Sequence, residues 1–284
     1  MSIIQAVLLG LLQGLTEFLP VSSSGHLAMF QNLFHIGEGT ENMFMFDILL
    51  HVGTLVSIII VFYKDIGNLI KEFFGIVGDT FMNIPRWISR EPAKKVLRTS
   101  YRRFVIMIIV ATIPTGIIGI ILKDLVEDAA ATLIIPGICF LMTAALLLIS
   151  HFLPEGYKLP KDAGYIDSAI VGVAQGFATL PGLSRSGTTL TIGMLCGLDS
   201  RFALKFSFIM SIPAVLGAAV LEIKDAIGTK FELSYLVGML VAAISGIIAI
   251  KFMVALVKRR KFVYFSIYCA ICGIVCIVGH FLTK

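Results

Sequence analysis

Two short polar stretches lie inside apolar sequence and carry most of the residues that can do chemistry. Residues 13–27 read QGLTEFLPVSSSGHL and hold a carboxylate, three consecutive hydroxyls and an imidazole. Residues 175–190 read QGFATLPGLSRSGTTL and contribute a guanidinium. Ionisable groups are costly in hydrocarbon, so at membrane depth they indicate function. We expect the two stretches to meet in one site.

The residues around each proline are predicted to form an anion-binding site. Pro20 and Pro181 end one short helix in each stretch, and the hydroxyls that follow can cap the next helix. A helix N-terminus attracts anions through its unpaired N–H groups and its dipole. The guanidinium of Arg185 binds phosphate through two parallel hydrogen bonds. The pattern favours a phosphate or pyrophosphate ligand, bound by Gln13, Ser22, Ser24, Gly25, Ser184, Ser186, Gly187 and Thr188.

Four residues are candidates for catalysis, namely Glu17, Ser23, His26 and Arg185. Ser23 and His26 share a helix face, and a hydroxyl beside an imidazole is a common form of activated nucleophile. Glu17 can bind a divalent cation together with pyrophosphate oxygens, or it can orient or deprotonate the nucleophile. Arg185 would neutralise the developing charge. We therefore predict hydrolysis of a phosphoric anhydride, by attack of Ser23 or of an activated water.

Each of these residues also has a structural interpretation. The serines can cap helices without touching a ligand, and Arg185 can form a buried ion pair with Glu17 that holds the two stretches together. Capping alone does not explain why both stretches carry charge. Asp47 and His51, four positions apart at the start of a later apolar segment, are interpreted as supporting or structural residues.

The composition is that of an integral membrane protein. The chain of 284 residues is 57% hydrophobic and 14% charged, with a mean hydropathy of +0.95, whereas soluble domains carry about 25% charged residues. The net charge of +5 comes from short basic clusters between apolar segments, which is typical of membrane topology and excludes nucleic acid as the expected partner. The first basic residue is Lys64, so no signal peptide is expected. Five cysteines lie in apolar segments, which favours packing over zinc binding.

The predicted fold is an all-α polytopic membrane protein, a single domain over residues 1–284. A span needs about 20 apolar residues, and each half of segments 2–34 and 169–197 is shorter, so both are predicted to be re-entrant helical hairpins. Residues 64–103 are polar and are expected to hold an amphipathic surface helix anchored by Phe73, Phe74, Phe81 and Trp87. Residues 123–131 are expected to form a loop. Six full spans are predicted, at 46–63, 104–122, 132–152, 203–221, 234–257 and 263–282.

An internal repeat relates the two hairpins. A shift of 162 positions aligns Gln13 with Gln175 and Ser22 with Ser184, and it places Glu17 on Thr179 and Ser23 on Arg185. Repeat one is assigned to 1–122 and repeat two to 169–257, with 132–152 as a connecting span and 263–282 as the last span. Three full spans separate the hairpins, so they enter from opposite faces. That arrangement is an inverted-topology repeat with its site at the interface.

The positive charges give the expected orientation. Residues 64–103 contain nine Lys and Arg residues, and residues 258–261 read KRRK. Both segments are expected to be cytoplasmic, and the predicted spans place them on one side. The N-terminus and the C-terminus then lie outside.

The motifs QGLTEFLPVSSSGHL and PGLSRSGTT resemble the two signatures of the bacitracin-resistance type of undecaprenyl-diphosphate phosphatase. The resemblance covers essentially the whole chain and implies hydrolysis of undecaprenyl diphosphate with a divalent cation, Mg²⁺ or Ca²⁺. It implies an acidic motif at Gln13 and Glu17, a motif serine at Ser23, a histidine at His26 and an arginine motif at Ser184–Ser186. Gln13 departs from the glutamate of many members, which weakens any mechanism with two carboxylates on the metal. Leu183 replaces a common threonine.

The resemblance further implies recycling of the lipid carrier for cell-wall synthesis at the bacterial plasma membrane, and resistance to bacitracin. The expected partners are a polyprenyl diphosphate and membrane lipids, with a homodimer as one option for assembly. The alternative function is a transporter or flippase for a lipid or its head group, because inverted repeats with broken helices also occur in secondary carriers. The cluster of Ser23, His26 and Glu17 favours hydrolysis, since a simple anion carrier does not need it.

Overall fold

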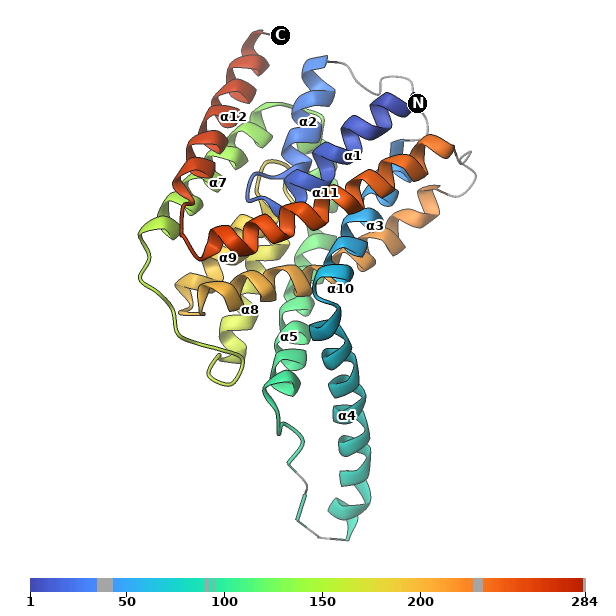
Figure 1. Cartoon of the computed structure of the whole chain (residues 1–284), viewed down its shortest axis with the longest axis vertical. Coiled ribbons are helices and arrows are strands. Elements are labelled where there is room, and N and C mark those ends of the chain that lie inside the picture. Colours follow the sequence, from blue (N-terminus) through green and yellow to red (C-terminus); the bar gives the residue numbers. More distant parts are fainter. Residues whose placement is uncertain (35–42, 90–91, 94, 227–231, 283–284) are drawn as a thin grey trace.

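The structure is a computed structural model that describes residues 1–284 except 35–42, 90–91, 94, 227–231 and 283–284 (Figure 1). Its described residues form helices and no named strand, with one isolated bridge between Lys158 and Leu198. In chain order the helices are α1 Ile3–Phe18, α2 Ser23–Phe34, α3 Met43–Val61, α4 Tyr63–Ile88, α5 Ser100–Ile121, α6 Lys123–Ala130, α7 Ile134–Phe152, α8 Tyr165–Phe177, α9 Arg185–Leu195, α10 Ser200–Ala226, α11 Leu233–Val257 and α12 Val263–Leu282.

Five of these helices are long and apolar enough to cross a membrane, namely α5, α7, α10, α11 and α12. Helix α3 passes the same test when it is joined to α4, but the two are bent by 87° relative to one another. The prediction of an all-α polytopic membrane protein is therefore confirmed. Of the six expected full spans, five correspond to helices that pass this test on their own, and the sixth is α3, which ends at the bend.

Each of the two polar stretches contains a turn that separates two short helices. We call these two turns the breaks. Helix α1 has 16 residues and α2 has 12, with a turn at residues 19–22 between them. Helix α8 has 13 residues and α9 has 11, with a turn at residues 178–184. At 1.5 Å rise per residue none of the four reaches the ~30 Å of a bilayer core. Both turns lie inside the bundle of helices and not at either end of it (Figure 1).

The polar segment after α3 contains the expected amphipathic helix, α4. Phe73, Phe74 and Phe81 are exposed along one side of it, whereas the side chain of Trp87 lies outside the described residues. On the other side, Arg102 of α5 donates hydrogen bonds to Glu72 at 2.7 Å and to Asp79 at 2.5 Å. Figure 1 shows α4 as a long arm beside the start of α5.

The prediction of a loop at 123–131 is wrong, because these residues form the short helix α6. Lys123 and Glu127 pair across one turn at 3.7 Å, and Asp124 lies in the first turn, where a negative charge favours the helix dipole. The expectation rested on the position of the segment between the predicted spans 104–122 and 132–152, where a connection can also form a short polar helix.

The short helices pack against helices that are distant in sequence. Helix α1 lies along α11, and α8 lies along α5. Glycines permit these contacts: a Cβ at Gly172 of α8 would lie 2.2 Å from the carbonyl oxygen of Ala111 in α5. Small residues allow backbones to approach in the way that membrane helices use for association. The first helix of each predicted repeat thus packs against the last span of the other, which brings the two breaks together.

We expect Gly172→Ala to lower the free energy of unfolding by about 1–3 kcal/mol, because the added methyl forces two backbones apart. Gly116→Ala is the matched control on α5, since a Cβ there meets nothing within 4 Å. Removal of a mid-helix glycine there should leave stability equal or raise it by up to ~1 kcal/mol. Unfolding in detergent measures both variants. Equal stability of the two would contradict close packing of α5 on α8.

Candidate active site

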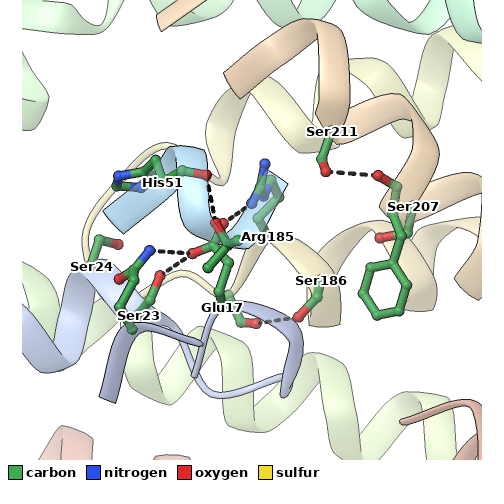
Figure 2. Close-up of polar contacts among 12 residues, drawn as sticks. Glu17, Ser23, Ser24, His51, Arg185, Ser186, Ser207 and Ser211 are labelled. Carbon is green, nitrogen blue, oxygen red and sulfur yellow. Dashed lines mark hydrogen bonds and ion pairs between the residues drawn. The ribbon is translucent and has the colours of Figure 1, made fainter. Parts of the chain in front are cut away.

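Glu17 is the centre of the polar contacts between the two breaks (Figure 2). Its Oε2 accepts hydrogen bonds from the Ser23 hydroxyl at 2.5 Å and from Gln13 Nε2 at 3.1 Å. Its Oε1 pairs with Nη2 of Arg185. The Glu17 side chain is 6% exposed and that of Arg185 is 21% exposed. The predicted meeting of carboxylate, hydroxyl and guanidinium is present in the structure.

Ser22 shapes the first break. It has a φ of 66°, a left-handed conformation that is uncommon for a residue with a side chain. Its carbonyl oxygen accepts hydrogen bonds from the backbone N–H of His26 at 3.2 Å and from Nδ1 of that residue at 2.7 Å. Its hydroxyl accepts from the N–H of Gly25 at 3.2 Å and from the N–H of Gly182 at 3.1 Å. Ser22 therefore turns the chain and also joins the two breaks.

The second break is held by hydroxyls in the same manner. Ser184 caps α9 by accepting from the N–H of Gly187 at 3.2 Å. Thr143 of α7 accepts from the N–H of Ser184 at 2.9 Å and donates to the carbonyl of Gly182 at 2.9 Å. Ser186 donates to the carbonyl of Leu19 at 3.1 Å. The capping interpretation thus holds for Ser22 and Ser184, and Ser186 ties one break to the other.

The two breaks can approach each other closely only because glycine occupies both contact positions. A Cβ at Gly25 would lie 2.6 Å from Cα of Gly182, and Gly182 itself has a φ of 93°. A side chain at either position would separate the two turns. Gly25, predicted to contact substrate, therefore has a packing role in the structure.

A cavity of about 430 Å³ opens beside the Glu17–Arg185 pair. Helices α2 and α9 begin at Ser23 and Arg185, both of which line it, so the positive ends of two helix dipoles meet there. Most of the remaining wall is apolar, with Leu27, Ile48 and Val215 as examples. Such a cavity suits a ligand with an anionic head and a hydrocarbon tail.

The predicted site residues fall into two groups, those that line the cavity and those that do not. Those that line it are Glu17, Ser22, Ser23, Ser24, Ser184 and Arg185. The described lining does not include Gln13, Gly25, His26, Ser186, Gly187 or Thr188. Gln13 still contacts the site through Glu17, whereas the hydroxyl of Thr188 is buried and has no partner among the described residues.

His26 faces away from Ser23. Its Nε2 lies 2.7 Å from the hydroxyl of Tyr268 in α12, and its ring packs edge-on against Phe140 with 5.2 Å between ring centroids. Since Nδ1 donates to the Ser22 carbonyl, Nε2 accepts the proton of Tyr268. The expected Ser23–His26 pair is absent from the described contacts. Both residues lie in α2, but Ser23 donates to Glu17 whereas His26 contacts Tyr268, so the shared helix turn does not bring the two side chains together.

Three residues that the sequence analysis did not place in the site line the cavity. Asp47 and His51 of α3 do so, although their spacing suggested a supporting role. Figure 2 shows the His51 ring on the same side of the site as Ser24. Gln175 also lines the cavity. The repeat marked Gln175 as the counterpart of Gln13, which was the one signal available from the sequence.

The oxygen donors of the site fit a hard divalent cation of the Mg²⁺ or Ca²⁺ type. Among the described residues there is no cluster of three or more His, Cys, Asp or Glu side chains arranged to hold a metal ion. Mg²⁺ nevertheless binds through one or two carboxylates plus substrate phosphates. Glu17 at the cavity wall provides one such carboxylate. The residues therefore fit a metal that is bound together with the phosphates.

The fold and the site define a class of protein: a polytopic membrane protein with a buried, charge-paired site between two broken helix pairs. The comparisons with known proteins give its family. The family model described as "Bacitracin resistance protein BacA" matches residues 6–275, and the chain belongs to this family.

Relatives named undecaprenyl-diphosphatase are similar over nearly their whole length. One from Methanobrevibacter smithii is 41% identical, with 98% of each chain covered. One from Alkaliphilus metalliredigens is 42% identical over 94% of this chain and 95% of the relative. One from Bacteroides thetaiotaomicron is 41% identical over 98% of this chain and 99% of the relative. The resemblance of the two motifs is thus supported along the chain.

We expect Arg185→Met to destabilise the protein by about 3 kcal/mol, because the carboxylate of Glu17 is left buried without its partner. The double variant Glu17→Gln/Arg185→Met should recover most of the loss, since no buried charge then remains. Lys123→Met is the control, because the Lys123–Glu127 pair is 55% and 65% exposed and should contribute less than ~1 kcal/mol. Unfolding in detergent measures all three. A double variant as unstable as the single one would contradict charge compensation.

Proposed function

We propose that this protein hydrolyses undecaprenyl diphosphate to undecaprenyl phosphate and inorganic phosphate, recycling the lipid carrier for cell-wall synthesis and giving resistance to bacitracin. The observation that carries the proposal is the contact of Ser23, Glu17 and Arg185 at one cavity with an otherwise apolar wall. The family and the printed names of its relatives support the same activity. A nucleophile, a proton acceptor and an anion-binding cation are the groups that this reaction needs.

Ser23 would attack the terminal phosphorus. The bond from that phosphorus to the bridging oxygen breaks, and undecaprenyl phosphate leaves. The hydroxyl proton of Ser23 passes to Glu17, whose Oε2 it already contacts at 2.5 Å. Water then attacks the phosphoserine, inorganic phosphate leaves, and the hydroxyl of Ser23 regains a proton. Direct attack by water activated by Glu17 is the close variant.

Charge neutralisation would come from Arg185 and the N-termini of α2 and α9. The guanidinium carries five donors, and its described contact with Glu17 uses Nη2. The other donors can bind phosphate oxygens in the cavity. A bound divalent cation held by Glu17 and the diphosphate would add Lewis-acid stabilisation of the transferring phosphoryl group.

His26 is proposed to act through Ser22. Its contacts with the Ser22 carbonyl and Tyr268 hold the left-handed turn that presents Ser23. The geometry favours Glu17 over His26 as the acceptor of the Ser23 proton. The expectation that His26 transfers protons stays a prediction, and the activity of His26→Ala across pH tests it.

The location and partners follow the same proposal. The chain is a multi-pass membrane protein. We propose that it resides in the plasma membrane with residues 64–103 and 258–261 in the cytoplasm and both termini outside, and that its substrate is a polyprenyl diphosphate. A homodimer stays an option for assembly. No observation on the described residues favours the transporter over the hydrolase.

The proposal predicts phosphate release from a polyprenyl diphosphate in detergent micelles with Mg²⁺ or Ca²⁺. Ser23→Ala and Arg185→Ala should each lower kcat/KM by at least ~100-fold, because each removes a group that stabilises the transition state. EDTA should abolish release, and added metal should restore it. Lys123→Met serves as the control with unchanged activity.

Three outcomes would contradict the proposal or a part of it. Absence of release by folded wild-type protein with metal present would exclude the hydrolase. Full activity of Ser23→Ala would exclude the serine as nucleophile and leave the variant in which water attacks directly, whereas full activity in EDTA would remove the metal from the proposal.

A further inference from the structure

Gln175 of α8 is a buried polar residue in the cavity wall, and the reaction proposed above gives it no role. Its side chain is 1% exposed. It lines the same cavity as Glu17 and Arg185, together with Thr115 of α5. Its Oε1 has no hydrogen-bond partner within the described residues. A buried acceptor without a partner is destabilising, so its position calls for a ligand.

The neighbours of Gln175 fix the orientation of its amide. Nε2 lies 3.4 Å from Oγ1 of Thr115 and 3.5 Å from the carbonyl oxygen of Met210. The Met210 carbonyl can only accept, so the nitrogen must face it. The Thr115 hydroxyl lies 2.8 Å from the carbonyl oxygens of Ala111 and Gly172, to which it donates, so it can accept from Nε2. A flipped amide would set two acceptors against each other, which leaves Oε1 as the atom without a partner.

An unpartnered acceptor selects a ligand that carries a hydrogen-bond donor. Ionised diphosphate oxygens are acceptors and would be repelled by Oε1. The proposed reaction includes two neutral donors, the Ser23 hydroxyl and the water that attacks phosphorus. The hydroxyl already donates to Glu17, which leaves the water. A glutamine amide is not basic enough to take a proton, but it can orient a water, as glutamines do in phosphoryl-transfer enzymes.

We propose that Gln175 Oε1 accepts a hydrogen bond from the water that attacks phosphorus, and that Gln175 is thereby the residue that positions this water. The inference rests on the proposed hydrolysis. In the step concerned, the water oxygen bonds to the phosphorus of phosphorylated Ser23 and the bond from phosphorus to Ser23 Oγ breaks. Glu17, which took the Ser23 proton in the first step, returns that proton to the Ser23 oxygen as the bond breaks. It takes one proton from the water and releases it to solvent, and the other water proton stays on the released phosphate. Gln175 takes no proton and only holds the water in line.

The test compares Gln175→Met with wild type in detergent. Methionine keeps the length of the side chain and removes the acceptor. We expect kcat to fall at least ~10-fold while KM changes less than ~2-fold, because the residue contacts water and not the diphosphate. Acid-quenched reactions with substrate labelled in the terminal phosphate should show phosphorylated Ser23 accumulating in the variant. The unfolding midpoint should change little, because removal of the unpartnered buried acceptor offsets the loss of the two long hydrogen bonds from Nε2 to Thr115 and Met210.

Ser168→Ala is the matched control on the same helix. Ser168 is also fully buried, its hydroxyl donates to the Gly164 carbonyl at 3.3 Å, and it is not among the described residues of the cavity wall. It should keep wild-type kcat and KM. A general effect of altered polar packing in α8 would appear in both variants.

Several outcomes would overturn the inference. A raised KM with unchanged kcat would assign Gln175 to substrate binding, and a shifted metal-activation curve would make it a metal ligand. A lowered unfolding midpoint with full kcat would make it structural. Wild-type protein that releases no phosphate would instead contradict the proposed function, so the two failures are distinguishable.

Discussion

The buried carboxylate of Glu17 needs partners that only the packing of the whole protein can bring to it. A charge at membrane depth is stable only when it is paired and hydrogen-bonded, and Glu17 draws its partners from both breaks. Ser23 and Gln13 come from the first pair of helices, and Arg185 comes from the second. The same contacts place the Ser23 hydroxyl and the Arg185 guanidinium at one cavity. The pairing that stabilises the buried charge therefore also arranges the proposed catalytic groups.

Packing of the two predicted repeats against each other brings these partners to Glu17. Helices α1 and α8 each pack against a span of the other repeat through glycine contacts. Ser22 and Ser186 then bond across the breaks, to the N–H of Gly182 and to the carbonyl of Leu19. Irregular backbone at membrane depth survives only where protein covers it and satisfies its polar groups. The two turns cover each other's backbone, and their residues also form the site.

The two copies of the predicted repeat contribute different side chains to the site. The shift that aligns the breaks places Glu17 on Thr179 and Ser23 on Arg185, so each copy supplies what the other lacks. Gln13 and Gln175 occupy equivalent positions but have different surroundings. Gln13 donates to Glu17, whereas Gln175 donates to Thr115 and Met210 and lines the cavity. Two positions that the predicted repeat makes equivalent therefore differ in role, since Gln13 serves the carboxylate and Gln175 lines the cavity.

The sequence by itself determined the membrane class, the positions of the helix breaks and the meeting of Glu17 with Arg185. These follow from local hydropathy, from proline and hydroxyl patterns, and from the cost of unpaired charge in hydrocarbon. Tertiary structure alone decided the direction of His26, because that depends on Tyr268 in α12, 242 positions away. It also decided that Asp47, His51 and Gln175 line the cavity, since helices distant in sequence form that wall. Helical spacing gives the faces of one helix, but which neighbour each face meets depends on how all the helices pack.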